Sequence, residues 1–263
     1  MRQCFGEVLG EDHKDGRAFP WTLPTHDMRQ AHQSGRPRCR KGTVLSGEVD
    51  PVEVIRKSDP YFFITYPNPG QFPGLEVRQH LDDVFSRLCE HLMNMTSFPK
   101  GQKDPPGYID KISIPSGHDW WKNILSKLAR CRILLPLYSE RYFTSTTCGK
   151  EWHAFSIRQR LHEKATGGTP HAILPILWTP MAPEDMPRVA QEIQSHTLGM
   201  PALYHSEGLY GLAVNRAYRD EYELALWGIA KTIVNKARST QLRACDPEIF
   251  QDLENIFDEE DPK

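Results

Sequence analysis

The chain has 263 residues, of which 39% are hydrophobic and 25% are charged, and its formal net charge is -2 at pH 7. This length and composition predict one large globular domain with appended segments rather than a disordered or fibrous chain. The near-zero net charge carries no overall signature of nucleic-acid binding, so we expect no nucleic-acid partner.

Two further classes of protein are disfavoured by the sequence. The apolar run at residues 172–178 contains Pro175 and is far shorter than the roughly 20 residues that a membrane-spanning helix needs. The six cysteines are scattered without close pairs, and no secretory leader pattern precedes them. Reduced thiols are therefore favoured over a disulfide framework. We expect a cytoplasmic protein without a membrane span.

Residues 1–57 are rich in Gly, Pro, His and Arg and show no sustained apolar period. Such a segment cannot bury enough apolar surface to fold alone. We expect it to be a flexible arm or linker. The basic cluster at residues 36–41 is of a kind that is usually only solvated.

Residues 58–238 are the predicted folded domain, in which strand and helix patterns alternate. Short aromatic, β-branched or continuously apolar runs indicate strands, and apolar residues that recur every three or four positions indicate helices. We expect strands at residues 61–66, 107–114, 133–137 and 172–178 and helices at residues 81–92, 118–128, 148–164 and 218–238. Weaker patterns predict a short helix at residues 186–193 and a fifth strand within residues 195–203.

The alternation of strands and helices predicts right-handed crossovers and a doubly wound parallel α/β sheet. The continuous apolarity of residues 172–178 suits a parallel strand that is covered on both faces. Pro175 cannot donate a ladder hydrogen bond, which places this strand at an edge or a bulge.

Residues 239–263 form an acidic tail. Asp246 is a candidate N-cap with Pro247 at the first helical position, so we expect a short helix there. Its apolar stripe would be Ile249, Leu253 and Phe257. The alternatives that remain at this point are that the tail docks into the groove of a protein partner, or that it is a terminus that packs on its own domain or frays.

The strand at residues 133–137 leads into a loop rich in Ser, Tyr and Thr and then into a helix that begins close to Glu151. In open α/β sheets, ligands bind at the carboxyl ends of the strands. The sequence therefore delivers one carboxylate, Glu151, to the edge where a ligand is expected.

Five segments follow one another along the predicted domain: Phe62-Phe-Ile-Thr-Tyr66, Gly107-Tyr-Ile-Asp110, Gly117-His-Asp-Trp120, Leu134-Leu-Pro-Leu-Tyr-Ser139 and Ser145-Thr-Thr-Cys-Gly-Lys-Glu-Trp152. In this order they resemble the boxes of a Toll/interleukin receptor (TIR) domain over about residues 58–238. The resemblance looks closest to bacterial TIR proteins, especially an actinobacterial group in which the third strand runs into Tyr-Phe-x-Ser-x-x-Cys-Gly-x-Glu-Trp.

The resemblance implies a flavodoxin-like sheet and homo-oligomerisation through the loop after the second strand. In many bacterial and plant members it also implies cleavage of NAD+, as in antiphage defence or cell suicide, with the catalytic glutamate at the place of Glu151. NAD+ is then the substrate, and no cofactor is expected. The product is left open between ADP-ribose and a cyclic isomer.

A single carboxylate suffices for this chemistry. Ordinary glycosidases need two carboxyl groups because the leaving oxygen must be protonated. Nicotinamide departs as a neutral group from a positively charged bond, so it needs no general acid. One carboxylate near the ribose then stabilises the developing oxocarbenium ion, which is the role expected of Glu151.

Four other residues are candidate substrate contacts. Thr65 and Tyr66 end the first strand and are expected to border the nicotinamide riboside, although a packed strand end is the alternative. Trp120 offers a flat surface for a base, whereas the helix pattern places Trp121 in the core. Ser145 is expected either to hydrogen-bond Glu151 or to cap the helix. For Cys148, one turn further on, we favour a structural role.

Other chemistries are not indicated. No Gly-x-Gly-x-x-Gly or Walker-type loop follows any predicted strand, and the histidines and cysteines lack the spacing of a zinc site. The main alternative to an enzyme is a non-catalytic TIR-like adaptor that recruits other proteins. The loop at residues 68–73 departs from common TIR patterns and bears on substrate fit.

Overall fold

The structure is a computed structural model that describes residues 52–67, 77–110, 118–193 and 199–258. One compact unit runs from Glu48 to Lys263, and a second, Met1–Gly47, lies outside the described residues. Most of the arm predicted for residues 1–57 and the unusual loop at residues 68–73 therefore also lie outside the description.

Four parallel strands form the central sheet in the order β3-β2-β4-β5. Phe62 of β2 lies opposite Gly107 of β3 on one side and Ile133 of β4 on the other. The chain passes from β2 out to β3 and then back across β2 to β4, so the winding reverses between β2 and β4. The carboxyl ends of these two strands form the switch point of a doubly wound sheet. The strands are β2 (Phe62–Thr65), β3 (Gly107–Ile109), β4 (Ile133–Tyr138) and β5 (Ile176–Leu177).

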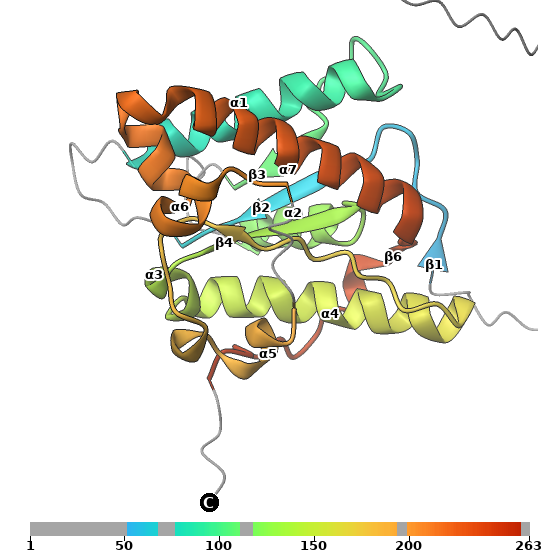
Figure 1. Cartoon of the computed structure of the whole chain (residues 1–263). Coiled ribbons are helices and arrows are strands. Elements are labelled where there is room, and N and C mark those ends of the chain that lie inside the picture. Colours follow the sequence, from blue (N-terminus) through green and yellow to red (C-terminus); the bar gives the residue numbers. More distant parts are fainter. Residues whose placement is uncertain (1–51, 68–76, 111–117, 194–198, 259–263) are drawn as a thin grey trace, which may run out of the picture. The chain divides into compact units, whose positions relative to one another are not determined.

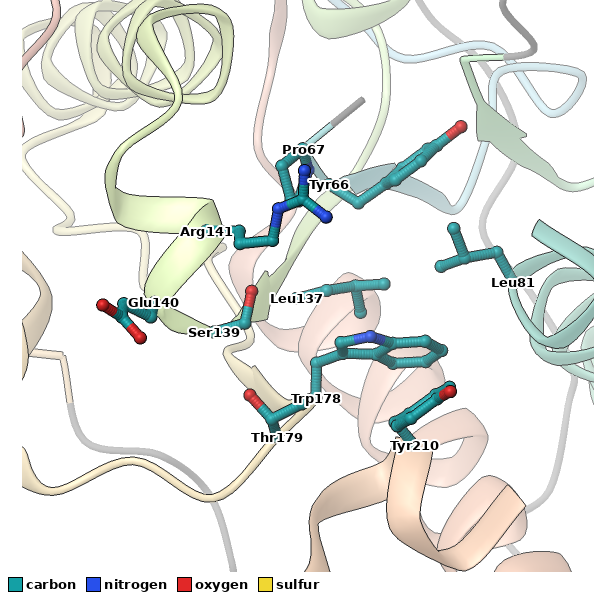
Figure 2. Close-up of a pocket in the computed structure, with 10 residues that line it drawn as sticks. All are labelled: Tyr66, Pro67, Leu81, Leu137, Ser139, Glu140, Arg141, Trp178, Thr179 and Tyr210. Carbon is teal, nitrogen blue, oxygen red and sulfur yellow. The ribbon is translucent and has the colours of Figure 1, made fainter. Parts of the chain in front are cut away.

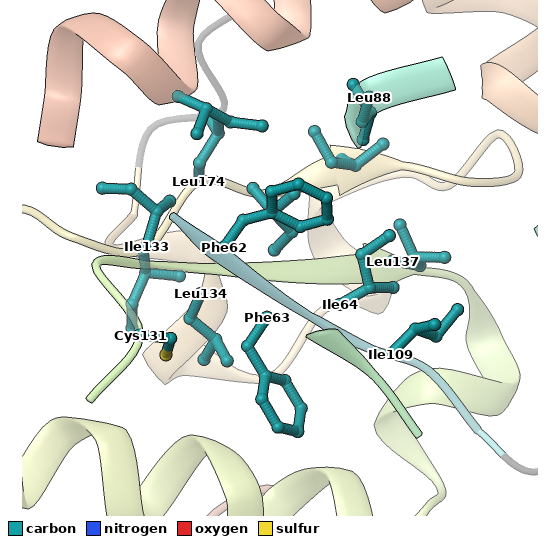
Figure 3. Close-up of a cluster of buried hydrophobic side chains, with 14 of the residues drawn as sticks. Phe62, Phe63, Ile64, Leu88, Ile109, Cys131, Ile133, Leu134, Leu137 and Leu174 are labelled. Atoms are coloured by element: carbon teal, nitrogen blue, oxygen red, sulfur yellow. The ribbon is translucent and has the colours of Figure 1, made fainter. Parts of the chain in front are cut away.

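The apolar core lies on both faces of this sheet. Successive side chains of a strand point to opposite faces, and in β2 Phe62 points toward Leu88 on one side while Phe63 points to the other (Figure 3). All four side chains of β2 are buried. A sheet buried on both faces explains why its strands are continuously apolar rather than alternating.

Helices cover both faces of the sheet (Figure 1). α1 and α7 pack against each other on one face together with α6, while α4 covers the opposite face and α2 packs against it. The α-helices are α1 (Val77–Met95), α2 (His118–Leu128), α3 (Glu140–Phe143), α4 (Thr146–Thr166), α5 (Arg188–Gln191), α6 (Ala202–Val214) and α7 (Arg219–Thr240). Short 3-10 turns occur at η1 (Pro183–Asp185), η2 (Arg216–Tyr218) and η3 (Pro247–Ile249).

The predicted α/β architecture is confirmed. The four main helices and the short helix at residues 186–193 are all present. The strand that contains Pro175 lies at the edge of the sheet, and its ladder is interrupted there: Ile173 forms an isolated bridge with Leu134, and pairing resumes at Ile176. The residues of this segment that bond to β4 are Ala172, Leu174 and Trp178, so the N–H that Pro175 lacks would face the open edge of the sheet. The donor missing from the ladder itself is that of Pro136 in β4, which has the same parity as Leu134 and Tyr138.

The predicted fifth strand within residues 195–203 is wrong where it can be compared. Residues 194–198 lie outside the description, but Ala202 and Leu203 belong to α6. Pro201 precedes this helix with φ −56°, a value that suits the start of a helix. β3 likewise ends at Ile109, short of residue 114, and residues 111–117 are not described.

Segments on either side of residues 58–238 pair with each other. β1 (Val52–Glu53) is antiparallel to β6 (Ala244–Cys245), and both lie in the compact unit that begins at Glu48. The fully buried guanidinium of Arg158 in α4 helps to hold β6 in place. It donates hydrogen bonds of 2.5 to 3.4 Å to the backbone oxygens of Leu128, Cys131, Leu242 and Arg243.

The C-terminal segment packs on its own domain. Asp246 caps the short turn η3, but no helix follows among the described residues up to 258. Phe257 is buried, with its ring centroid 5.2 to 5.6 Å from the rings of Tyr142, Phe143 and Trp152. The segment therefore covers the start of α4, the helix that carries Glu151.

Candidate functional site

Glu151 lies near the start of α4, where the helix approaches the carboxyl end of β2. The helix is N-capped by Ser145, whose side chain accepts a hydrogen bond from the backbone N–H of Cys148. This cap fixes where the first helical turn begins. Glu151 therefore lies about two helical turns beyond Ser145. Only 4% of Glu151 is exposed, and the hydroxyl of Thr65 donates a hydrogen bond to its Oε2. The structure thus brings together two of the predicted site residues.

Burial is the main influence on the ionisation of Glu151. It raises the pKa of this carboxyl to about 8, with a smaller contribution from the charge of Asp110, while the Thr65 hydrogen bond lowers the pKa. Desolvation disfavours the charged form of a carboxyl, whereas a donated hydrogen bond favours it. At pH 7 Glu151 is therefore mainly protonated in this arrangement.

Asp110 links the two remaining aromatic candidates. It follows β3 directly, and both its carboxylate oxygens lie 3.1 Å from Nε1 of Trp120, which donates to them. The hydroxyl of Tyr66 donates to the backbone oxygen of Asp110 at 2.9 Å. Burial also raises the pKa of the Asp110 carboxyl. Tyr66 and Trp120 are thus held around one acidic residue at the same edge of the sheet.

Sequence reasoning did not select Asp110 as a site residue. The available signal was its position, because it is the first polar side chain after a buried strand, at the edge where ligands bind in this fold. Trp120 is half-buried and lies against Trp121, with ring centroids 5.8 Å apart. Trp121, which was expected in the core, is only half-buried as well.

The structure shows a capping role for Ser145 and a buried position for Cys148. The hydroxyl of Ser145 is occupied by the N–H of Cys148, which is one of the two roles expected for it. Burial raises the pKa of the Cys148 thiol, and the nearby charge of Glu151 adds to this rise. A thiol in such surroundings is a poor nucleophile, so Cys148 acts as a packing residue.

A cavity of about 320 Å³ opens at the switch point, beside this polar group (Figure 2). Tyr66 and Pro67 line it from the end of β2, and Ser139, Glu140 and Arg141 line it from the end of β4. Its floor and far wall are formed by residues of α1, β4 and α6 and by the two residues that follow β5. They are Leu81, Leu137, Tyr210, Trp178 and Thr179. The cavity therefore occupies the position where a doubly wound sheet is expected to bind a ligand.

Glu151 itself does not line this cavity. The two are connected through consecutive residues, because Thr65, the last residue of β2, bonds to Glu151, and Tyr66, the next residue, borders the cavity. Adjacent residues of a strand point to opposite faces. The carboxyl group and the cavity thus lie on either side of the end of β2.

Of the residues that line the cavity, only Tyr66 was predicted from the sequence as a site residue. Three of the missed residues, Trp178, Tyr210 and Arg141, bear on what the cavity can bind. Trp178 follows β5 directly, Tyr210 lies in α6, and Arg141 lies in α3, just beyond β4. Trp178 and Arg141 stand at carboxyl ends of strands, which was a usable signal. No sequence signal indicated Tyr210. It reaches the cavity because α6 is kinked, and the sequence did not predict that helix.

The fold and this edge define an α/β protein with a cavity at the switch point of a flavodoxin-like sheet. Residues 102–199, which run from before β3 through α5 and include Glu151, match a protein-family model described as "TIR domain". This part of the chain is therefore similar to a TIR domain, and the sheet of four parallel strands flanked by helices agrees with a flavodoxin-like TIR fold. Comparisons with curated proteins and with solved structures gave no match, and the finer resemblance to an actinobacterial group gains no support from them.

None of the helices in the described ranges is both long and apolar enough to cross a membrane. The same part of the chain contains no group of three or more His, Cys, Asp or Glu side chains placed to hold a metal ion.

Proposed function

We propose that this protein cleaves the bond between nicotinamide and ribose in NAD+ and that Glu151 is the catalytic carboxylate. The positively charged nicotinamide leaves as a neutral group, so the reaction needs no general acid. The ribose becomes an oxocarbenium ion in the transition state, and a fixed negative charge beside it lowers the barrier. Water completes a hydrolysis, whereas attack by a group of the nucleotide itself completes a cyclisation.

The observation that carries this proposal is the Thr65–Glu151 pair beside the switch-point cavity. The hydroxyl of Thr65 favours the ionised form of Glu151, the form that the reaction uses, and opposes the effect of burial. Carboxyl groups with strongly shifted pKa values next to a cavity are typical of functional sites.

The burial of Glu151 bears on whether the protein must assemble to be active. With 4% exposure, the carboxyl is shielded in the isolated chain. We propose that TIR–TIR self-association accompanies activity, as in bacterial defence or signalling.

The same burial favours a second candidate, a non-catalytic TIR scaffold that only mediates protein contacts. A carboxyl that is mainly protonated at pH 7 and nearly closed off from solvent serves in that case as a structural hydrogen-bond partner of Thr65. The two candidates predict opposite results when the assembled protein is incubated with NAD+: the enzyme releases nicotinamide, and the scaffold does not.

The test is release of nicotinamide from NAD+ by concentrated protein in a crowding agent, followed by chromatography. Wild type is expected to release nicotinamide, and Glu151→Ala is expected to lose at least about a hundred-fold in rate, as for removal of a principal electrostatic group. Glu184→Ala, at an exposed glutamate, is the matched control and should behave as wild type.

Absence of release from assembled wild type would favour the scaffold. Release that survives Glu151→Ala would instead overturn the assignment of the catalytic residue. The ratio of ADP-ribose to cyclic product in the same chromatogram separates hydrolysis from cyclisation.

A further inference from the structure

The switch-point cavity is large enough for one planar base and too small for a whole dinucleotide. Ligand cavities commonly measure about 300 to 1,000 Å³, and this one, at about 320 Å³, is at the lower limit. If NAD+ is the substrate, only one of its two rings enters, and the rest of the molecule runs along the edge of the sheet.

The far wall of the cavity is a fixed pair of aromatic rings. The ring centroids of Trp178 and Tyr210 lie 5.5 Å apart at 41°. The backbone N–H of Tyr210 donates to the oxygen of Trp178 at 2.9 Å, and His80 packs edge-on against Tyr210. Aromatic surfaces of this kind stack with nucleobases.

Gly208 makes this wall possible. It interrupts α6 with φ 67° and ψ 173°, a conformation that favours glycine. A Cβ atom at this position would lie 2.6 Å from the backbone oxygen of Trp178. The kink lets α6 approach the end of β5 closely, so that Tyr210 stands beside Trp178.

The mouth of the cavity carries a positive charge. In Figure 2 the guanidinium of Arg141 extends over the cavity toward Pro67, while the carboxylate of Glu140 points away from it. Arg141 forms no ion pair with any described residue. A free guanidinium in this place favours a phosphate group and disfavours the cationic nicotinamide ring.

We propose that this cavity binds the adenine base of NAD+, with Trp178 and Tyr210 as its stacking wall and Arg141 in contact with the pyrophosphate. The inference rests on the proposed function. It places the adenosine end on the cavity side of the end of β2 and the nicotinamide riboside on the side of Glu151. Tyr66, which borders the cavity and follows Thr65, separates the two halves.

The test uses ¹⁹F NMR of the full chain labelled with 5-fluorotryptophan. The chain has six tryptophans, and a Trp178→Phe spectrum assigns the resonance of Trp178. Titration with AMP and with ADP-ribose is expected to shift this resonance, whereas nicotinamide mononucleotide is expected to leave it in place. No shift with AMP at millimolar concentration, or a shift with nicotinamide mononucleotide instead, would overturn the proposal.

Two variants add a functional readout. Arg141→Glu and Tyr210→Leu are each expected to raise the KM for NAD+ about ten-fold or more with little change in kcat, since base stacking and phosphate contacts bind substrate and transition state alike. Arg160→Glu, at an exposed arginine of α4, is the charge-matched control. Equal KM values for Arg141→Glu and Arg160→Glu would contradict the assignment of Arg141.

The outcome for the cavity is separable from the outcome for the enzyme. If AMP shifts the Trp178 resonance in a protein that releases no nicotinamide, the adenine site is supported and the proposed activity is rejected. Release of nicotinamide without any shift of Trp178 rejects the adenine site and retains the activity.

Discussion

The hydroxyl of Thr65, the last residue of β2, donates a hydrogen bond to Oε2 of Glu151 in α4. Two opposed effects meet at this contact. Burial raises the pKa of Glu151 and is the larger effect, while the hydrogen bond from Thr65 lowers it. The balance, a pKa of about 8, makes the ionisation of Glu151 sensitive to small changes around it.

This balance predicts a pH dependence of activity. If the ionised form of Glu151 is the active one, kcat/KM for NAD+ rises with pH and reaches half its maximum near pH 8. Thr65→Val removes the hydroxyl and keeps the shape. Loss of a hydrogen bond to a charged group costs about 1.5 kcal/mol or more, which raises the pKa by about one unit. The variant should therefore be about ten-fold less active at pH 7 and recover at higher pH.

The control for this experiment is Thr232→Val, which changes a threonine of α7 whose hydroxyl bonds only within its own helix. Its pH–rate profile should coincide with that of wild type. A Thr65→Val profile that falls uniformly at every pH would show that Thr65 contributes by packing or by substrate contact rather than through the pKa of Glu151.

Stability should also depend on the ionisation of Glu151. Its folded pKa of about 8 exceeds the ordinary value of 4.5, so the folded state holds one more proton than the unfolded state between these limits. The corresponding stabilisation is present below pH 4.5 and is lost as the pH rises through about 8. Glu151→Gln does not titrate. Its stability relative to wild type should increase from pH 5 to pH 8.5 by a few kcal/mol, since one pKa unit corresponds to about 1.4 kcal/mol.

Urea unfolding of both proteins at the two pH values measures this difference. Glu184→Gln, at an exposed position, should show the same stability difference from wild type at pH 5 and at pH 8.5. A constant difference for Glu151→Gln as well would mean that its carboxyl is not held neutral by burial.

The four strands of the central sheet could be predicted from the sequence, but only part of the candidate site could be. Strands β2 and β4 were predictable because continuous apolar runs bounded by turns have few alternatives, and Glu151 followed from its place beyond β4. The cavity was not predictable, because its wall depends on the kink at Gly208 in a helix that replaced a predicted strand. Packing of the tail on α4 was likewise one of the alternatives that local patterns do not distinguish.

The guanidinium of Arg158 predicts a large effect on stability. It is fully buried and donates to four backbone oxygens that join α4 to the start of β4 and to β6. Arg158→Met fills much of the space but removes this donor from all four oxygens, of which that of Leu128 keeps only the Cys131 thiol. Each buried oxygen left without a donor costs about 1 to 3 kcal/mol. We expect a loss of at least about 3 kcal/mol in the free energy of unfolding. Arg160→Met, two residues on and exposed, should change it by less than about 0.5 kcal/mol.

The C-terminal segment lies close against α4 at Gly149. A Cβ atom at this position would collide with the side-chain oxygen of Asn255 and would lie 3.2 Å from its Cα atom. In a helix interior, replacing glycine by alanine normally stabilises by about 0.5 to 1 kcal/mol. Gly149→Ala should instead destabilise the protein, because Asn255 and the neighbouring Phe257 must move away from the helix.

Thermal unfolding and hydrogen exchange of residues 246–258 measure this effect. The double variant Gly149→Ala with Asn255→Gly removes the colliding side chain and should recover most of the lost stability, since only the 3.2 Å approach to Cα remains. Asn255→Gly alone serves as the reference for the loss of the asparagine. If Gly149→Ala raises the melting temperature and leaves exchange in residues 246–258 unchanged, the segment does not lie against α4 in solution, and the covering of the helix that carries Glu151 is refuted.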